Sequence, residues 1–225
     1  MRLILAVLLT AVGLAVAPGA SGPAYARPMD CPPNCDRIPD SAWIDPTALP
    51  LYSTYRWPGL AGLAVTATDP RFRFEQACAS PPVPDDPRSY AVAARAAVPQ
   101  PAGQWQLAVQ VLHWRGETWR GGQLASAVFD TAVQSLRRCQ LTSPLTSPSL
   151  TTDTPDRMAA VISNALPGQP VVHQYLLVNA ANSTVVELAM WATTPPRVGW
   201  PAVPDADVLD AMNTPLCTAY IDSCR

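Results

Sequence analysis

The chain has 225 residues, with 15 basic residues, all of them arginine, and 17 acidic residues, which gives a net charge of −2. This balance argues against a nucleic-acid-binding protein, because such proteins carry a clustered positive surface. The apolar fraction of 48% and the charged fraction of 14% exclude a disordered tail. The composition therefore favours a globular domain of mixed α and β structure.

The first 26 residues have the pattern of a secretory signal peptide. Arg2 precedes an apolar run from Leu3 to Val16, and Ala24-Tyr25-Ala26 offers small residues for a cleavage site. An uncleaved membrane anchor is the alternative, but a run of about 14 residues is shorter than the roughly 20 needed to span a bilayer. We expect a mature protein that begins at position 27, has no membrane span, and is secreted or held in the cell envelope.

Six cysteines follow the predicted cleavage site: Cys31, Cys35, Cys78, Cys139, Cys217 and Cys224. An even number in an exported chain predicts disulfide bonds, although the sequence alone does not fix their pairing. The economical hypothesis pairs Cys78 with Cys139, while the other four hold the terminal segments. Cys31-Pro-Pro-Asn-Cys35 lacks the helix N-terminus that stabilises a redox thiolate, so a structural bridge is favoured there.

Residues 27–70 are predicted to form a proline-rich arm, and residues 71–225 an α+β domain. Seven prolines between positions 28 and 58 recur too often for long regular elements. Four aromatic residues in the arm predict that it packs against the domain. They are Trp43, Tyr52, Tyr55 and Trp57.

The first patterned segments of the domain predict a strand pair and then a helix. Residues 89–98 alternate weakly, and residues 105–114 alternate well, with a turn at Ala102-Gly103 between them. From Gly122 to Cys139 the apolar period changes to that of a helix. Arg137 and Arg138 then complement the negative end of the helix dipole.

The second half of the domain predicts further antiparallel strands. Residues 171–179 and 184–193 form a predicted hairpin, residues 156–166 fit a helix or, preferably, a strand, and residues 205–212 fit a short helix. Residues 141–155 are rich in serine, threonine and proline and predict a loop. The predicted fold is α+β, with an antiparallel sheet covered by helices on one face and stapled by disulfides.

No common catalytic motif, phosphate-binding loop or metal-binding motif is present, and no cofactor is expected. His113 and His173 both lie on predicted strands. One of them could act as a general base near Asp130 or Glu187, but a hydrogen-bonded histidine at the edge of the core is the favoured interpretation. Asn182-Ser183-Thr184 matches a glycosylation sequon, and turn chemistry explains it better.

The tryptophans could line a ligand pocket or fill the core of a chain that has only three phenylalanines. We favour the core for most of them and expect Trp119 and Trp200 to be the most exposed. Tryptophan and arginine are frequent in binding surfaces. The candidate binding surface therefore consists of Trp119, Arg120, Trp200, His113 and His173.

The helix that ends in Ser135-Leu136-Arg137-Arg138-Cys139, preceded by the strand Gln106 to Leu112, resembles a known family. It is similar to the extracellular sensor domain of the mycobacterial serine/threonine kinase PknH and its free-standing exported relatives. The similarity covers the region from Phe72 to Met212. It implies a module that senses a ligand or partner through a central cleft, and it assigns no binding residue. The absence of lysine and the abundance of alanine and arginine fit a high-GC actinobacterial source.

We therefore expect an exported, non-enzymatic domain that binds a small ligand or an envelope protein. Export and disulfides without a catalytic set are the observations behind this expectation. One alternative is an envelope hydrolase whose site is centred on His113 or His173. Another is a secreted structural or effector protein that works through its proline-rich arm.

Overall fold

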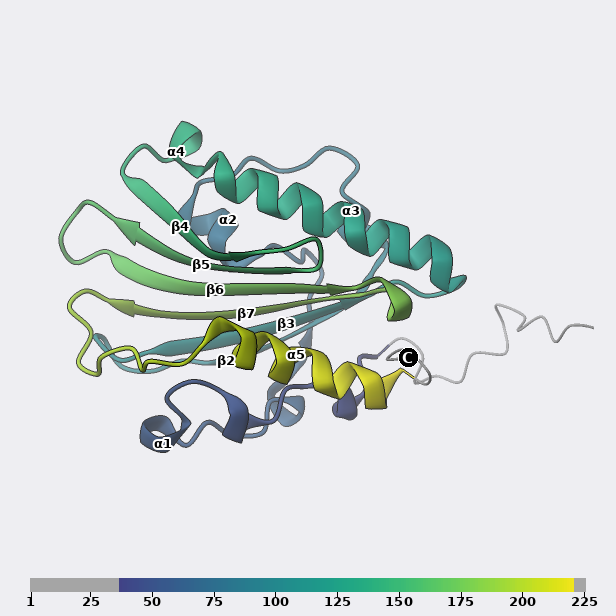
Figure 1. Ribbon diagram of the computed structural model, residues 1–225, viewed down its shortest axis with the longest axis horizontal. Helices are drawn as coiled ribbons and strands as arrows, with labels where there is room; N and C mark the ends of the chain where they lie inside the picture. The colour runs from purple at the N-terminus through teal and green to yellow at the C-terminus, as the bar shows by residue number, and fades with distance from the viewer. Residues whose placement is uncertain (1–36, 221–225) are drawn as a thin grey trace, which may run out of the picture. The chain divides into compact units, whose positions relative to one another are not determined.

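A seven-stranded antiparallel sheet is the centre of the fold in the computed structural model (Figure 1), which describes residues 37–220. The strand order is β1-β2-β3-β7-β6-β5-β4, so the predicted α+β class and antiparallel sheet are confirmed. The strands are β1 (Val65–Thr66), β2 (Val92–Val98), β3 (Gln106–His113), β4 (Thr146–Asp153), β5 (Arg157–Asn164), β6 (Pro170–Asn179) and β7 (Thr184–Thr193).

The predicted hairpin between β6 and β7 forms, and its turn closes with a short 3₁₀ helix, η6 (Ala180–Asn182). Ser183 then adopts a left-handed backbone with φ of 56°. In the centre of the sheet, β7 pairs with both β3 and β6. Most residues of β3 and β7 are buried, because each of these strands has a neighbour on both sides and a packed layer on both faces.

One face of the sheet packs against α3 (Thr118–Arg137), and the short helix α2 (Arg73–Ala77) lies on the same side. The predicted apolar stripe of α3 is buried at Val128, Ala132 and Leu136. The helix begins four residues earlier than the sequence pattern suggested, because two glycines bring its first turn against η6.

The other face is covered as well, by α5 (Asp205–Ala219) and by the N-terminal arm. The sequence predicted helices on one face of the sheet, and it predicted that the last helix ends at Met212. The helix instead continues through Pro215 to bury Leu216. That burial offsets the hydrogen bond that proline removes from a helix interior. The sheet is thus the middle of three layers (Figure 1).

The arm is part of the core under α5, as its aromatic residues predicted. Trp43 and Trp57 are buried, and the Trp57 indole N–H donates a 2.8 Å hydrogen bond to the Pro50 carbonyl. Near the end of the arm, β1 pairs with β2 and adds the edge strand of the sheet. The short helical turns of this part are η2 (Asp40–Ala42), η3 (Pro46–Ala48), α1 (Tyr52–Tyr55) and η4 (Ala61–Leu63), and η5 (Pro87–Tyr90) follows α2.

The prediction of a loop at residues 141–155 was wrong for most of this segment. The structure has a helical turn, α4 (Cys139–Thr142), and then the edge strand β4. Proline is tolerated in an edge strand, where its missing N–H faces away from the sheet, and Pro148 occupies such a position opposite Ile162. The neighbouring segment forms the strand β5, the preferred of its two interpretations.

The predicted Cys78–Cys139 disulfide is present and joins the end of α2 to the start of α4. Cys217 is disulfide-bonded as well. Cys31, Cys35, Cys224 and the predicted signal peptide lie outside the described residues. Within residues 37–220, none of the helices combines the length and the apolar character needed to cross a membrane.

Candidate functional site

The five predicted binding residues fall into two groups at the two ends of α5. His113 and His173 lie on the same face of the sheet, but His113 is level with Thr184 of β7 and His173 with Met190. Six residues along a strand correspond to roughly 20 Å. We call the region around His113, Trp119, Arg120 and η6 the η6 end, and the region around His173 and Trp200 the Trp200 end.

At the η6 end, the first turn of α3 lies against the β6–β7 turn. A Cβ atom on Gly122 would lie 2.4 Å from the Ala180 carbonyl oxygen, and one on Gly121 would lie 2.4 Å from the Ser183 Oγ. The Ser183 hydroxyl also donates a 3.0 Å hydrogen bond to the Thr118 carbonyl. The two glycines therefore permit a close contact between helix and turn that positions Trp119 and Arg120.

A pocket of about 350 Å³ opens between this turn and the C-terminal end of α5. Its lining includes His113, Thr118, Asn182 and Tyr220. The His113 ring stacks on the Tyr220 ring with centroids 4.3 Å apart. The His113 Nδ1 lies 3.1 Å from the Thr184 hydroxyl, which donates a hydrogen bond to the Asn182 carbonyl. The structure thus places His113 at the edge of the core, as predicted.

Asn182 is the unusual residue of this pocket. Its side chain is only 4% exposed, yet neither the amide oxygen nor the amide nitrogen has a hydrogen-bond partner. The Tyr220 hydroxyl is also buried and lies close to Thr184 without a hydrogen bond of normal geometry. Buried polar groups without partners are rare because each one costs stability. The buried Asn182 side chain is no acceptor for glycosylation in this fold.

The lining of the pocket carries no charge near pH 7 among residues 37–220. Burial lowers the pKa of His113, and a hydrogen bond to the Asn182 main chain only partly opposes this effect. Burial raises the pKa of Tyr220 to about 12. A neutral imidazole and a protonated phenol therefore face each other across the stacked pair.

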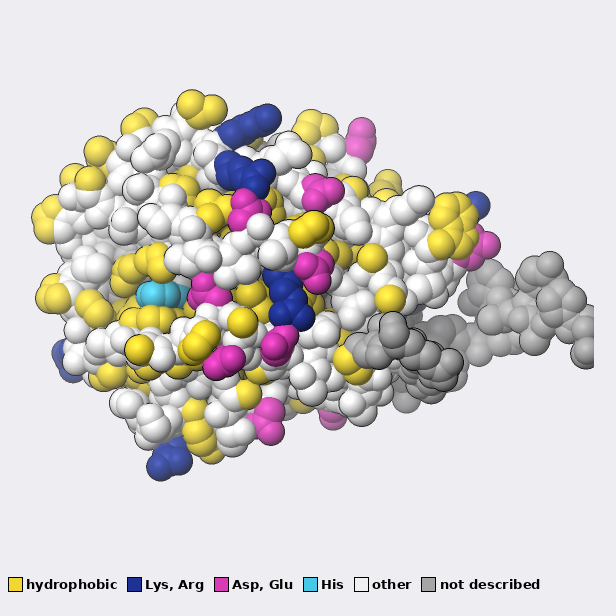
Figure 2. All heavy atoms as spheres, viewed as in Figure 1, with side chains coloured by type: hydrophobic (Ala, Val, Ile, Leu, Met, Phe, Trp, Pro, Cys, Tyr) yellow, Lys and Arg dark blue, Asp and Glu magenta, His cyan; other side chains and the backbone are white. Residues whose placement is uncertain are grey.

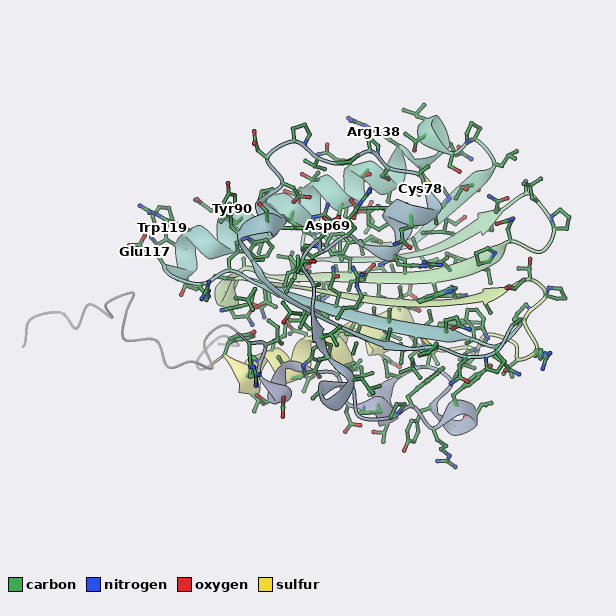
Figure 3. All side chains as sticks on the ribbon, turned by 180° about the vertical axis from the view of Figure 1, so that it is seen from behind. Asp69, Cys78, Tyr90, Glu117, Trp119 and Arg138 are labelled. Atoms are coloured by element: carbon green, nitrogen blue, oxygen red, sulfur yellow. A yellow bond between two sulfur atoms is a disulfide. The ribbon has the colours of Figure 1, made fainter. Side chains whose placement is uncertain are left out.

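Trp119 lies beside this pocket, over a second and more open hollow of about 580 Å³ along α3 and η6. Its side chain is 59% exposed, and the Arg120 guanidinium lies 5.0 Å from the ring centroid. Arg120 also forms an ion pair with Glu117, with 3.0 Å between the Arg120 Nε and the Glu117 Oε2. Figure 3 shows Trp119, Glu117 and the exposed Tyr90 at one end of the molecule. The expected exposure of Trp119 is confirmed.

At the Trp200 end, three aromatic rings contact one another. Trp200 stacks on His173 with centroids 3.6 Å apart, and Trp105 lies 4.9 Å from Trp200 and 5.4 Å from His173. The Trp105 indole N–H donates a 2.8 Å hydrogen bond to the Val198 carbonyl. Trp200 is only partly exposed, because it closes the edge of the core under α5.

Asp205, the first residue of α5, is the charged group of the Trp200 end. It accepts a 3.1 Å hydrogen bond from the Thr152 hydroxyl. Burial raises the pKa of Tyr175, and the negative charge of Asp205 raises it further. Burial lowers the pKa of His173 to about 4 although Asp205 opposes this shift. Figure 2, which views the α5 face, shows acidic and arginine side chains among apolar ones along this helix.

Glu187 is a buried carboxylate whose only predicted role was that of a partner for a histidine. It lies on the α3 side of the sheet, whereas both histidines lie on the α5 side. The exposed Asp130 of α3 is also on the other side of the sheet from them. The acid–base pairs considered from the sequence are therefore not formed.

The actual partners of Glu187 are main-chain and side-chain groups beneath α2. Glu187 is 2% exposed and accepts hydrogen bonds from the Arg73 main-chain N–H and, at 3.0 Å, from Gln174. Burial raises its pKa to about 7, although these hydrogen bonds and Arg95 oppose the rise. Gln110 and Gln174 are fully buried nearby. The sequence did carry a signal of this buried polar group: Gln110, Gln174 and Glu187 are polar residues at inward-facing positions of otherwise apolar strands.

A buried ion pair fixes the segment that carries α2. Arg88 donates hydrogen bonds of 2.7 and 3.0 Å to the two carboxylate oxygens of Glu75, and both residues are buried. Asp86 pairs with the same guanidinium at 2.6 Å. Since every charge in this group has a partner, we assign it a structural role.

Within the part of the chain that the structure describes, no three histidine, cysteine or acidic side chains are grouped as a metal site. No protein-family model matches the chain, and no curated protein is significantly similar to it. The geometry of the two ends of α5 is therefore the basis for a functional assignment.

Proposed function

We propose that the chain is an exported, non-enzymatic binding module, sensor-like in type, whose ligand occupies the pocket at the η6 end. One observation carries this proposal: Asn182 lines a pocket of about 350 Å³ and has two buried polar atoms without partners. Small-molecule pockets begin at about 300 Å³ and combine apolar walls with a few polar groups. Trp114, His113 and Tyr220 supply the aromatic walls.

Four features of the sequence and the structure support the setting of this function. The predicted signal peptide and the even number of cysteines favour work outside the cytoplasm. The Cys78–Cys139 disulfide agrees with an oxidising compartment. The similarity to exported sensor domains of mycobacterial kinases favours the actinobacterial envelope or exterior and a role in sensing.

Native mass spectrometry of the protein purified from an actinobacterial culture tests the proposal. We expect an added mass that disappears on denaturation. The Ala181→Phe variant, which adds a ring at the rim shared by this pocket and the hollow beside Trp119, should lose this mass, and the control Ala165→Phe, at an exposed position away from the pocket, should keep it. An added mass that survives in Ala181→Phe, or a bare polypeptide in every sample, would contradict a small-molecule pocket at this place.

Trp119 favours a second candidate function, the binding of a protein partner. It is a large, exposed aromatic residue beside an open hollow and next to an arginine, which is the composition of interface hot spots. A photo-crosslinking amino acid at position 119 should give one discrete cross-linked product in the exporting host. The control is the same amino acid at the exposed Leu141, beyond the other end of α3. Equal labelling from both positions would argue against a specific partner.

A further inference from the structure

The Asn182 amide is the most specific chemical group beside the pocket. Its nitrogen can donate two hydrogen bonds and its oxygen can accept two, and none of these is made. A buried amide without partners destabilises a fold, and replacing it with an apolar group of similar shape is neutral or stabilising. The fold gains nothing from this amide, so its use is to be sought in binding.

The charge of the pocket restricts the ligand. Among the residues that the structure describes, no acidic residue and no arginine lines the pocket, and its one histidine is neutral near pH 7. A charged group that entered would lose its hydration without gaining a counter-charge, which is costly. The part of the ligand that enters the pocket is therefore uncharged.

The shape of a carboxamide restricts the ligand further. In Asn182 the donor and the acceptor lie side by side, so the best complement also presents a donor beside an acceptor and closes a ring of two hydrogen bonds. Primary amides and lactams have this arrangement. A trans secondary amide, such as an ordinary peptide bond, presents its N–H and C=O on opposite sides.

We propose that the pocket at the η6 end binds a small, uncharged ligand that carries a primary amide or lactam group, which pairs with the Asn182 side chain through two hydrogen bonds. The amide is closed off from solvent in this conformation, so binding includes a rotation of the Asn182 side chain toward the pocket. The stacked His113 and Tyr220 rings form the adjacent wall. This inference rests on the proposed function, and it names the ligand chemistry of the same pocket.

Three matched probes test this chemistry by protein-observed NMR titration at pH 7: benzamide, N-methylbenzamide and benzoate. We expect benzamide to shift resonances of the η6 end and to bind at least ten-fold more tightly than the other two. Equal affinities for the three probes, or no binding of benzamide, would overturn the inference. If benzamide fails while the native added mass is still lost in Ala181→Phe, the pocket binds other chemistry and the proposed function stands.

Two variants of Asn182 complete the test. In Asn182→Leu we expect benzamide binding to fall at least ten-fold while the unfolding temperature stays the same or rises, because the variant removes an unpaired amide. Retained binding, or a markedly lower unfolding temperature, would overturn the proposal. Asn182→Asp keeps the shape of the side chain and should reverse the preference, so that benzamidinium binds better than benzamide through a bidentate ion pair. This reversal is the deciding readout should Asn182→Leu not fold.

Discussion

Gly122 is a residue at which helix α3 lies directly against the main chain of the β6–β7 turn. In an exposed helix interior, alanine is more stable than glycine by about 1 kcal/mol. Here the added methyl group would lie 2.4 Å from a main-chain oxygen, which cannot turn aside like a side chain. We expect Gly122→Ala to destabilise the protein by about 1–3 kcal/mol, measured by urea denaturation.

The control for this prediction is Gly59→Ala. Nothing lies within 4 Å of a Cβ atom at Gly59, and its φ is not positive. Such a change should leave the unfolding free energy within about 0.5 kcal/mol of the wild type, or raise it slightly. A wild-type-like Gly122→Ala variant would show that the turn moves away from the helix easily.

Glu187 should make stability depend on pH. Its pKa is about 7 in the fold, against 4.5 for a free side chain. Between these values the folded state binds more protons than the unfolded state, so this residue lowers the unfolding free energy as the pH rises from 4.5 toward 7. We expect the wild type to lose up to about 1.4 kcal/mol per pH unit relative to Glu187→Gln over this range, measured by denaturant titrations at several pH values.

His173 acts in the opposite direction and serves as the contrast. Its pKa is lowered from 6.5 to about 4 in the fold, so the unfolded state binds more protons between these values and stability rises with pH. The variant His173→Phe keeps a ring against Trp200 and should remove that rise.

For the Glu187 prediction, parallel pH curves of unfolding free energy for the wild type and Glu187→Gln would contradict the assignment of a raised pKa to the carboxylate.

The Cys78–Cys139 disulfide acts at the level of elements, because it ties the end of α2 to the start of α4, which follows α3 directly. Its cysteines are 61 positions apart and fully buried. Closing a loop of this length stabilises the fold by about 4 kcal/mol in the chain-entropy model. We expect the double variant Cys78→Ala/Cys139→Ala to lose about 2–5 kcal/mol of unfolding free energy. A loss below about 1 kcal/mol would mean that noncovalent contacts, such as the Arg88–Glu75 ion pair, hold the segment without the disulfide.

Elements with a clear apolar period could be predicted from the sequence, and elements with a misleading composition could not. The helix around Val128 and the strands β6 and β7 follow their periods closely. The strand β4 is rich in serine, threonine and proline, because an edge strand is half solvated and tolerates residues that are typical of loops. The second half of α5 was missed because Pro215 suggests a helix end, and only the packing of Leu216 shows otherwise.

The candidate site shows the same division. The sequence placed His113 and His173 on strands and Trp119 at a helix start, because these positions follow from local patterns. It could not show that the histidines lie at opposite ends of α5, since that depends on the pairing of β3, β7 and β6. The unpaired Asn182 amide was equally out of reach, because hydrogen-bond partners are known only once the turn has met the helix.

At the scale of the whole molecule, the sheet separates two apolar cores. Ile44 in the arm belongs to the α5 side, and Ile162 on β5 belongs to the α3 side. The substitutions Ile44→Val and Ile162→Val should each lower the unfolding free energy by about 0.5–1.5 kcal/mol. The double variant should equal the sum of the two within about 0.5 kcal/mol, because the residues share no packing partner across the sheet. A larger deviation in denaturant unfolding would show that the two layers are coupled.

The arm cannot be treated as an appendage of this molecule. Ile38, Trp43, Leu49 and Trp57 are buried in the same core as α5. Deleting the arm would expose the sheet and the helix together, so a lost function in such a variant would report unfolding. A role of the arm in partner binding is better tested by changing its exposed residues, such as Arg56.

The edge strand β4 has a consequence for how molecules of this protein behave in a crowded solution. A free strand edge offers main-chain donors and acceptors to the sheet of another molecule, which is how chains assemble into fibrils. In β4 this row is interrupted twice, because Pro148 has no N–H and the pairing register shifts between Leu150 and Thr152. This edge is therefore a poor template for sheet extension, and molecules are not expected to pair through β4 at concentrations where a regular edge would nucleate aggregates.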